Sequence, residues 1–565
     1  MKIFFVLAVF GVVGRLFYWQ IYKGKQLSVK ARNQYQQGAL LTANRGNILS
    51  SDATWLAASG EAYLAFASLP ELTKSPSEIA EKLAPFFVDP SEEPDGRQEF
   101  MVEIDRIKAL LGRHDVVWVP LRQKVTPEIK KNIQALGIEG IGFEEQQMRV
   151  YPEASSAAHL LGFVGKDEEG ADTGYFGLEG YYDLPLSSKP GFFSREADAA
   201  GTPILFGSSK KISAVSGVDL LTNIDKTVQF SVEDALLKGI EKYGASGGVV
   251  IVMNPKTGAI LAASAFPSYD PSSYSEYGNE YFKDPAISFS FEPGSIFKVL
   301  VMAGALDAGA VTPETKCDIC SGPVVVDKYT IETWNKVYNP DASMVDVIVH
   351  SDNVGMVFVA KTLGADRLYD YLDAFGIGKL TGIDLQGEMS PKLREKGTWS
   401  IVDLATGGFG QGVAVTPIQM VKAVAAIAND GILVTPRVVS KIIGDDWEEE
   451  VKPAPGERVI SEKTASQVTA MMYEAAKKGE AKWTYLRGFK VAGKTGTAQI
   501  PISGHYDEEK TMASFVGFAP YDEPKFVMLV TLTQPTSSPW ASETAAPLWY
   551  SIARDLFPYF GIQPE

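Results

Sequence analysis

Two side chains suited to acyl transfer stand three residues apart in "FEPGSIFKVLVMAGALDAG", residues 291–309. Pro293 and Gly294 favour a helix start, so Ser295 and Lys298 are expected on one helical face, one turn apart. Unpaired N–H groups at a helix start favour a developing oxyanion. A lysine buried against the apolar run would have its ammonium form penalised and could accept the serine proton. The pair therefore indicates a serine nucleophile with a lysine base.

The S-x-x-K spacing alone is weak evidence, because a chain of 565 residues produces it by chance. A second copy, Ser208 and Lys211 in "GSSKKIS", lies in a polar stretch with no apolar helix after it. This copy predicts a solvated loop and no second nucleophile.

A second triplet, Ser351-Asp352-Asn353, precedes the helical pattern "VGMVFVAKTL". A hydroxyl there could relay a proton between base and leaving group, and Asn353 could orient a substrate amide. The alternative is an ordinary helix N-cap, since Ser, Asp and Asn are all favoured at that position.

A third motif, Lys494-Thr495-Gly496-Thr497, lies in the strand-like "VAGKTGTAQI". Lys494 could bind a carboxylate, Gly496 would let a substrate backbone approach the strand, and the Thr497 N–H could join an oxyanion hole. Another K-T-G, Lys256-Thr257-Gly258, lies in "NPKTG", which reads as a hairpin turn. In the order S-x-x-K, S-D-N, K-T-G the three motifs indicate a penicillin-binding or β-lactamase-type serine enzyme.

The elements that must position these motifs read as a mixed α/β domain. A helix is expected over 232–243 and a hairpin from strands 247–253 and 259–265. A late strand pair covers 488–500 and 513–533, which predicts a largely antiparallel sheet. Upstream, 76–87 and 126–137 predict short helices, and the Gly- and Asp-rich segment 165–183 predicts a loop.

The chain begins with an apolar segment, Ile3 to Tyr22, of the length that a bilayer requires. No small-x-small cleavage site follows, which favours an uncleaved anchor over a signal peptide. Lys23, Lys25, Lys30 and Arg32 follow the segment, so positive-inside counting alone would leave the large domain in the cytoplasm. Long domains can cross regardless of that bias, and the side is assigned below from the substrate.

Composition excludes some classes of partner and cofactor. A net charge of −16 argues against nucleic acid, which would favour a basic surface. Cys317 and Cys320 form a C-x-x-C pair, for which a disulfide or two plain thiols is favoured over zinc, because only four histidines are present and none is spaced as a ligand. No metal and no other cofactor is expected.

Further segments carry a resemblance to a known family. "RVYPEASSAAHLLGFVG", "GGFGQGVAVTPIQMVKAVAAIANDG" and "SFVGFAP" surround the three motifs. With them, the chain resembles the class B penicillin-binding proteins, the membrane-anchored peptidoglycan D,D-transpeptidases of cell division and elongation. The resemblance implies an α+β serine transpeptidase fold at 216–565, an elongated pedestal (dimerisation-like) domain at 23–215, and a transmembrane anchor at 1–22.

The resemblance also implies roles for single residues. Ser295 would be acylated by a D-Ala-D-Ala stem peptide or a β-lactam, Lys298 would be its base, and Ser351 would shuttle the proton. The residues implied in substrate binding are Asn353, Lys494, Thr495, Gly496 and Thr497. The backbone N–H groups of Ser295 and Thr497 would form the oxyanion hole.

The resemblance further implies a cytoplasmic N-terminus, an extracytoplasmic catalytic domain and a polytopic glycan polymerase as partner. Two alternatives remain open: a carboxypeptidase or β-lactamase that uses water as acceptor, and a β-lactam sensor or scaffold that does not turn over.

Overall fold

The computed structural model describes residues 2–25, 36–88, 94–196, 209–502 and 505–565. The chain divides into two compact units. The first comprises Met1–Gly46 and Leu184–Val218, and the second comprises Asn47–Asp183 and Asp219–Glu565. All three motifs lie in the second unit, so that unit alone contains the candidate site.

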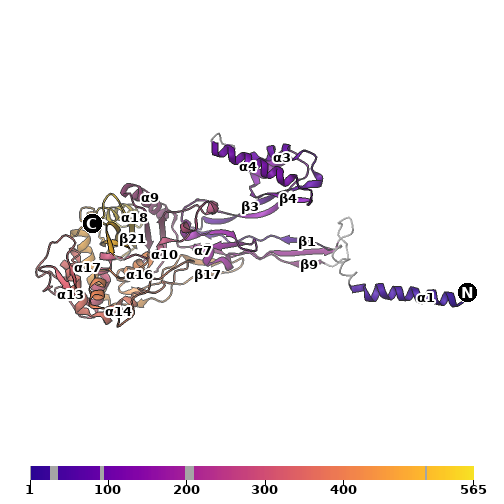
Figure 1. Cartoon of the computed structure of the whole chain (residues 1–565). Helices are drawn as coiled ribbons and strands as arrows, with labels where there is room; N and C mark the ends of the chain where they lie inside the picture. The colour runs from indigo at the N-terminus through magenta and orange to yellow at the C-terminus, as the bar shows by residue number, and fades with distance from the viewer. Residues whose placement is uncertain (1, 26–35, 89–93, 197–208, 503–504) are drawn as a thin grey trace. The chain divides into compact units, whose positions relative to one another are not determined.

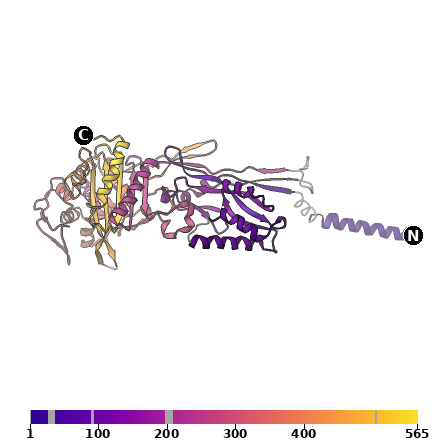
Figure 2. The same ribbon diagram turned by 90° about the horizontal axis from the view of Figure 1, so that it is seen from above.

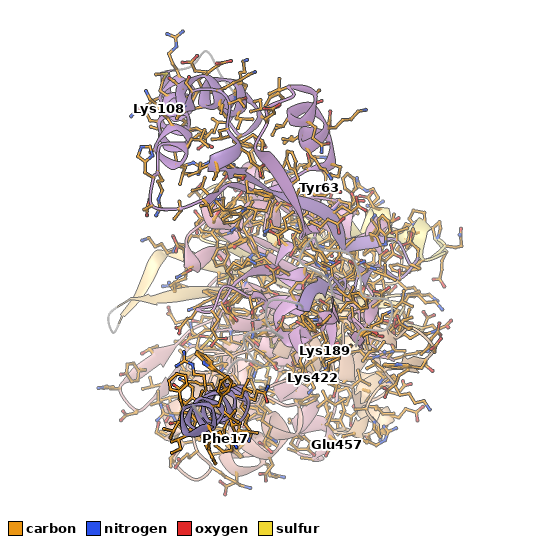
Figure 3. The ribbon with its side chains drawn as sticks, turned by 90° about the vertical axis from the view of Figure 1, so that its right-hand side faces the viewer. Phe17, Tyr63, Lys108, Lys189, Lys422 and Glu457 are labelled. Carbon is orange, nitrogen blue, oxygen red and sulfur yellow. A yellow bond between two sulfur atoms is a disulfide. The ribbon has the colours of Figure 1, made fainter. Side chains whose placement is uncertain are left out.

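The first unit begins with α1 (Lys2–Phe17), which continues into the π-helical turn η1 (Tyr18–Tyr22). Together they form a helix of 21 residues, long and apolar enough to cross a membrane. Its length is about 31 Å at 1.5 Å per residue. Every side chain is exposed, and Figure 3 shows side chains projecting all around the helix at Phe17.

A three-stranded sheet completes the first unit, with the order β1 (Gln36–Leu41), β8 (Gly191–Glu196) and β9 (Ser209–Ile212). Lys211 is exposed on β9, so the loop predicted for "GSSKKIS" is wrong at this residue, because its backbone pairs with β8 at Phe193. Ser208 lies outside the described residues.

In the second unit, a seven-stranded sheet joins segments from both halves of the sequence. Its order is β17-β16-β10-β2-β3-β4, and β5 also pairs with β3. The strands are β2 (Ile48–Leu49), β3 (Trp55–Ser68), β4 (Trp118–Val125), β5 (Ile141–Val150), β10 (Asp219–Thr222), β16 (Val439–Ile443) and β17 (Glu448–Glu450).

A separate hydrophobic core packs beside β3 and β4, built from α3 (Pro76–Leu83), α4 (Pro94–Leu111) and α5 (Pro127–Ala135). The two helices predicted here are confirmed. Ser75 caps α3 and Thr126 caps α5 by accepting a backbone N–H in the first turn, and each is followed by proline.

The loop predicted for 165–183 is wrong. Strands β6 (Phe163–Lys166) and β7 (Asp172–Tyr175) form a hairpin, and α7 (Gly177–Tyr181) follows. The Asp167 carboxylate accepts the N–H groups of Glu169 and Ala171 at 3.0 and 2.8 Å. The Gly- and Asp-rich composition therefore marks the tight turn, while the flanking residues pair as strands.

A five-stranded antiparallel sheet organises the region of the three motifs (Figure 1). Its order is β12 (Ile260–Phe266), β11 (Gly247–Met253), β21 (Phe526–Thr533), β20 (His505–Ala519) and β19 (Ala492–Ile502). The β11–β12 hairpin is confirmed, and "NPKTG" is its turn, closed by Asn254 Oδ1, which accepts from the Lys256 N–H at 2.9 Å. The late strand pair is instead three strands, since 513–533 folds back on itself.

Helices cover this sheet on both sides. α9 (Lys226–Tyr243) and α18 (Ala545–Tyr559) share one core with the strands, and Figure 2 shows α18 lying along them. α16 (Pro417–Ala428) packs against the same sheet through β11, β20 and β21. The predicted helix 232–243 is confirmed, and it starts earlier, because Asp225 caps it at the Thr227 and Val228 N–H groups.

A helical cluster packs near the edge strand β19. The nucleophile region begins with the 3₁₀ turn η6 (Gly294–Phe297), and the helices are α11 (Lys298–Asp307), α12 (Met344–Val349), α13 (Asn353–Leu363), α14 (Ala365–Ala374), α15 (Ile401–Gly407) and α17 (Glu462–Lys478). Shorter elements connect these parts: α6 (Ala158–Leu161), α8 (Asp183–Leu186), α10 (Pro285–Ser288), β13 (Val324–Val326), β14 (Tyr329–Ile331), β15 (Ile432–Leu433) and β18 (Glu457–Arg458). Cys317 and Cys320 form a disulfide, which decides among the alternatives left open for that pair.

Candidate active site

The turn that carries Ser295 packs directly against the strand that carries the K-T-G motif. Gly294 has a φ of +54°, and its N–H donates to the Gly410 carbonyl at 3.0 Å. A Cβ at Gly294 would stand 3.1 Å from the Thr497 carbonyl oxygen. Glycine is therefore required here by both the left-handed backbone and the close approach of β19. The predicted helix start is present, with a 3₁₀ first turn in place of an α-helical one.

Lys298 is the first residue of α11 and is fully buried. Its Nζ donates to the Ser351 carbonyl at 2.6 Å, to Asn353 Oδ1 at 2.7 Å and to Ser351 Oγ at 3.3 Å. Within the described part of the chain, the Ser295 hydroxyl makes no hydrogen bond, so the expected serine–lysine contact is not formed. A buried amine requires partners, and Lys298 takes them from the S-D-N motif, which lies farther along the chain.

The environment of Lys298 favours its neutral form. Burial lowers the pKa of Lys298 well below the usual range, and the charge of Lys494 lowers it further. Glu480 and Asp352 oppose this shift through their negative charges. The pKa of Lys494 is also lowered by burial, and Glu480 again opposes the change. Burial, the Lys494 charge and the two carboxylates Glu480 and Asp352 thus set the proton affinity of Lys298.

In the S-D-N motif, Asp352 caps a helix and Ser351 contacts the two lysines. Asp352 is the N-cap of α13 and accepts from the Gly355 N–H at 3.0 Å, as the capping alternative predicts. Ser351, just before it, has a left-handed φ of +55° and is buried. Its Oγ accepts from Lys494 Nζ at 2.9 Å and from Lys298 Nζ at 3.3 Å. A non-glycine residue in this region is strained, and such strain clusters at functional sites.

Both ends of the Asn353 side-chain amide contact protein atoms. Its Oδ1 accepts from Lys298, and its Nδ2 donates to the Glu332 carbonyl at 3.1 Å. The residue that was predicted to orient a substrate amide therefore holds Lys298 in place in this structure.

The K-T-G motif lies on the edge strand β19. Lys494 and Thr495 are buried, and Lys494 Nζ reaches the Thr495 carbonyl at 3.1 Å and its hydroxyl at 3.4 Å. The Thr495 hydroxyl in turn donates to Glu480 Oε2 at 3.1 Å. Thr497 is half-buried, and its hydroxyl accepts from the Ala541 N–H at 3.0 Å.

Gly496 was expected to let a substrate backbone approach the strand, and in the structure it lets the turn that carries Ser295 approach. A Cβ there would stand 2.8 Å from Ile296 Cγ2, 3.0 Å from the Ile296 nitrogen and 3.0 Å from the Pro293 carbonyl oxygen. The missing side chain thus lets β19 approach the nucleophile turn itself. This contact brings two motifs together that lie about 200 residues apart in the sequence.

A pocket of about 90 Å³ brings the motifs together. Its lining includes Ser295, Ser351, Asn353 and Thr497 from the predicted set. Sequence reasoning did not single out the other lining side chains, which are Trp334, Phe409, Gln411, Glu480 and Trp540. The Trp334 and Trp540 rings lie 5.5 Å apart. Gln411 lies in the Gly-Gln-Gly sequence of a segment that carries the family resemblance, which is the signal that could have identified it.

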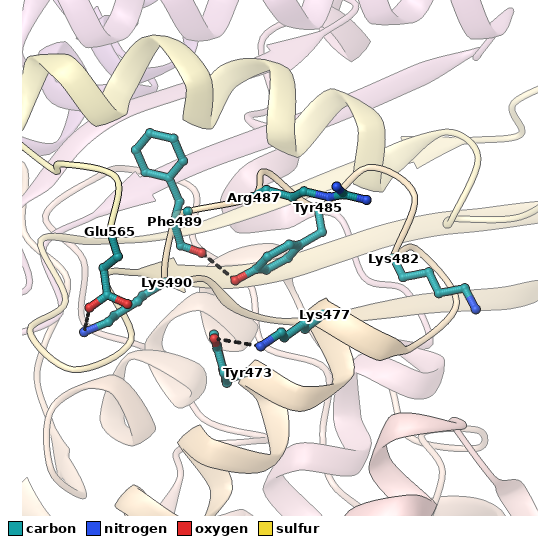
Figure 4. A pocket seen from close by; sticks show the side chains of 9 residues that line it. Tyr473, Lys477, Lys482, Tyr485, Arg487, Phe489, Lys490 and Glu565 are labelled. Atoms are coloured by element: carbon teal, nitrogen blue, oxygen red, sulfur yellow. Dashed lines mark hydrogen bonds and ion pairs between the residues drawn. The ribbon is translucent and has the colours of Figure 1, made fainter.

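A larger pocket of about 570 Å³ lies near the end of α17 (Figure 4). Tyr473 and Lys477 from the helix line it, together with Tyr485 and Lys490 from the segment that leads into β19. Lys490 pairs with Glu565, and Tyr485 donates to the Phe489 carbonyl. None of the residues of the three motifs lines this pocket, so the chemistry belongs to the smaller one.

Comparison with known proteins agrees with this geometry. Residues 248–556 match the family described as the penicillin binding protein transpeptidase domain, and residues 40–222 match the penicillin-binding protein dimerisation domain. Stage V sporulation protein D of Bacillus subtilis is 32% identical over 575 residues, which cover 100% of this chain and 86% of the relative.

Two further proteins are similar over nearly the whole chain. A probable peptidoglycan D,D-transpeptidase, PenA, of Neisseria meningitidis is 27% identical and covers 98% of this chain and 91% of its own length. The crystal structure of penicillin binding protein 3 from Mycobacterium tuberculosis, complexed with aztreonam, is 25% identical with a TM-score of 0.70. That match covers 93% of this chain and 98% of the other.

Proposed function

We propose that Ser295 is the residue that the substrate acylates, from the premise that the chain belongs to the class B penicillin-binding proteins. Members of this family are serine D-Ala-D-Ala transpeptidases of peptidoglycan, and this chain is one that binds β-lactams. One observation carries the assignment. Ser295 lines the pocket on the turn that Gly294 and Gly496 hold against the K-T-G strand. No protein group occupies its hydroxyl within the described residues, which leaves the oxygen available to a substrate.

We propose Lys298 as the base for Ser295. A neutral lysine amine keeps two N–H donors and one lone pair. The two shortest contacts of Nζ, at 2.6 and 2.7 Å, go to carbonyl-type oxygens, which can only accept. Two N–H groups serve these contacts, so in the neutral form the lone pair faces the third and longest contact, Ser351 Oγ at 3.3 Å, and is the site that would take the Ser295 proton. The lowered pKa of Lys298, caused first by burial, supports this protonation state.

Ser351 is the proposed proton shuttle. Its oxygen lies between the two lysines, at 2.9 Å from Lys494 and 3.3 Å from Lys298. A hydroxyl in that place can receive a proton from one amine while it gives its own to a leaving group. The strained backbone at Ser351 supports a role beyond capping, because Asp352 already caps the helix.

The remaining motif residues are proposed to bind the donor. Lys494 supplies positive charge beneath the Thr495 hydroxyl, which would donate to the terminal carboxylate of the stem peptide. Gly496 and Thr497 form the strand edge beside the nucleophile, and the N–H groups of Ser295 and Thr497 would stabilise the oxyanion. Asn353 is proposed to orient the substrate amide, and it also contacts Lys298 through Oδ1.

The reaction follows in two steps. Ser295 Oγ forms a bond to the carbonyl carbon of the penultimate D-Ala while its proton passes to Lys298. The C–N bond to the terminal D-Ala breaks, and that D-Ala leaves as an amine after it takes a proton through Ser351. An amine of a neighbouring stem peptide then attacks the ester, forms the new peptide bond and returns the proton to Ser295. A β-lactam would stop at the acyl-enzyme.

Membrane anchoring is part of the same proposal. The apolar helix Lys2–Tyr22 would anchor the protein, and the substrate lies outside the cytoplasmic membrane. We therefore infer a cytoplasmic N-terminus and an extracytoplasmic catalytic domain. The Cys317–Cys320 disulfide supports this side, because disulfides persist in oxidising compartments. A polytopic glycan polymerase is the partner inferred from the family, and the domain boundaries proposed are 1–22, 23–215 and 216–565.

The test is covalent labelling by a fluorescent penicillin. Ser295→Ala should abolish the labelled band, and Ser208→Ala, in the other S-x-x-K copy, should leave it unchanged. Crosslinking by the purified wild type, with a polymerase supplying glycan chains, separates a transpeptidase from a hydrolase and from a sensor. Labelling that survives Ser295→Ala would refute the proposed nucleophile.

A further inference from the structure

A carboxylate of the protein already occupies the subsite proposed for the carboxylate of the donor. Glu480 follows α17, is half-buried, and lines the pocket that contains Ser295. Its Oε2 accepts the Thr495 hydroxyl at 3.1 Å. This is the hydrogen bond that the stem-peptide carboxylate would make.

Lys494, Thr495 and Glu480 form a chain of hydrogen bonds that ends with the single hydroxyl proton of Thr495. Lys494 Nζ lies 2.9 Å from Ser351 Oγ and 3.4 Å from Thr495 Oγ1, and Thr495 points its hydroxyl proton at Glu480. A hydroxyl has one proton and can donate it to one acceptor at a time. The donor carboxylate must therefore displace Glu480 from Thr495 or bind without that hydrogen bond, and in either case it lies close to a like charge.

We propose that Glu480 is a specificity-determining residue that competes with the terminal carboxylate of the acyl donor for Thr495. The proposal rests on the proposed function, in which Thr495 and Lys494 receive that carboxylate. Glu480 lowers the affinity for every carboxylate-bearing donor, so that only a donor with enough additional contacts along the pocket is acylated well. A donor without the carboxylate does not meet this competition.

Glu480 has a second effect that must be separated from the first. Its negative charge raises the pKa of Lys298 and of Lys494, against the dominant lowering by burial. Any change at Glu480 therefore alters the base as well. The effect on Lys298 acts on the enzyme before a donor binds and is equal for all donors, so the ratio between two donors removes it. The effect on Lys494 is not equal: without Glu480 the pKa of Lys494 falls, which weakens the attraction for the acid donor and opposes the expected rise in the ratio.

The experiment compares a donor with a free carboxylate and its carboxyl-esterified analogue in second-order acylation of the full chain. Glu480→Gln keeps the shape and the acceptor oxygen but removes the charge. We expect the ratio of acid to ester rates to rise roughly 5- to 30-fold, as for removal of one nearby like charge. The matched control is Glu474→Gln. Glu474 lies on α17, pairs with Lys478 and makes no contact with Thr495, and its ratio should stay unchanged.

A second substitution tests the shared hydroxyl. In a Thr495→Val background there is no proton to compete for, so Glu480→Gln should raise the ratio less than in the wild type. Variants that acylate too slowly to measure are tested by binding instead. The acid donor should bind the double variant Ser295→Ala/Glu480→Gln more tightly than Ser295→Ala alone, by a similar factor.

Two results would overturn the proposal: an unchanged ratio in Glu480→Gln, or a fall in the ratio, which would make Glu480 a positioning residue for the donor. Failure of the proposed function is a different result, since Ser295→Ala would then still be labelled.

Discussion

Two buried lysines lie at one hydroxyl, and the charge of Lys494 makes a charge on Lys298 more costly. Lys298 and Lys494 both have a lowered pKa, with burial as the main cause, and the charge of Lys494 adds to the effect at Lys298. The pKa of the proposed base, Lys298, is therefore lowered by Lys494, the residue that we propose for binding the donor carboxylate. This coupling makes the pH dependence of acylation a direct test of the arrangement.

We predict that Lys494→Met moves the acid limb of the acylation profile to higher pH. Acylation uses neutral Lys298, so the rate rises as pH rises through the pKa of that residue, in a range well below the ordinary lysine value of about 10.4. Removal of the Lys494 charge raises the pKa of Lys298, so the acid limb of the profile is displaced to higher pH. The measurement uses a neutral, esterified donor, so that loss of carboxylate binding does not interfere.

Lys525→Met is the control for that profile. Lys525 is exposed and pairs with Glu523 at 2.9 Å, so its loss should leave the limb in place. An unmoved limb in Lys494→Met, or one displaced to lower pH, would show that Lys494 does not lower the pKa of Lys298.

At the level of single residues, the sequence indicated candidate reacting groups but not the side chains that contact them. Each motif residue has a chemical type that suits its proposed task, and the local sequence context excluded the second copies at Ser208 and Lys256. The contacts of Asn353 and Glu480 depend on which side chains meet across the fold. Glu480 stands in no motif, and only the packing of α17 beside β19 brings it to Thr495.

Among the elements, β19 lies in close contact with the turn that carries Ser295. Gly496 has no room for a methyl group, because backbone atoms of Ile296 and Pro293 stand 3.0 Å from the position of its Cβ. These are backbone atoms, so neither can move aside by a change of rotamer. The distance between strand and nucleophile is therefore fixed by glycine.

We predict that Gly496→Ala separates these two elements. Insertion of a methyl group into a packed contact costs typically about 1–3 kcal/mol of stability. Acylation should fall more than stability alone explains, because Ser295 moves relative to the strand. Chemical denaturation and penicillin acylation measure the two effects. Gly322→Ala is the control, since a Cβ there meets nothing within 4 Å, and equal effects in the two variants would refute the prediction.

Strand and helix patterns predicted several elements of the second unit, and they did so through local signals. The hairpin at 247–266 has a buried apolar run and a turn sequence, and α3 and α5 have caps followed by proline. The predictions failed where pairing is decided by distant partners. The segment 165–183 forms strand and helix despite its polar composition, and β9 pairs although all its side chains are exposed.

For the whole molecule, two kinds of observation disagree on which side of the membrane the catalytic domain lies. Basic residues after the anchor favour a cytoplasmic domain, while the substrate and the disulfide favour the outside. We predict that protease added to intact spheroplasts digests the large domain, whereas a cytoplasmic marker protein remains intact. Complete protection of the domain would mean that the basic residues determine the orientation.

The seven-stranded sheet has a consequence for how the protein reaches this structure. β2 pairs with β10, and the Asn47 N–H donates to Asp219 at a separation of 172 residues. β10 pairs in turn with β16, and Ser440 donates to Leu221 across 219 residues. A chain that crosses a membrane from its N-terminus exposes the edge of β2 until these strands follow. Pairing between strands so far apart in the sequence makes folding slow and leaves unpaired strand edges prone to aggregation. If the domain lies outside the membrane, as proposed, its folding there is expected to need chaperones that protect these edges.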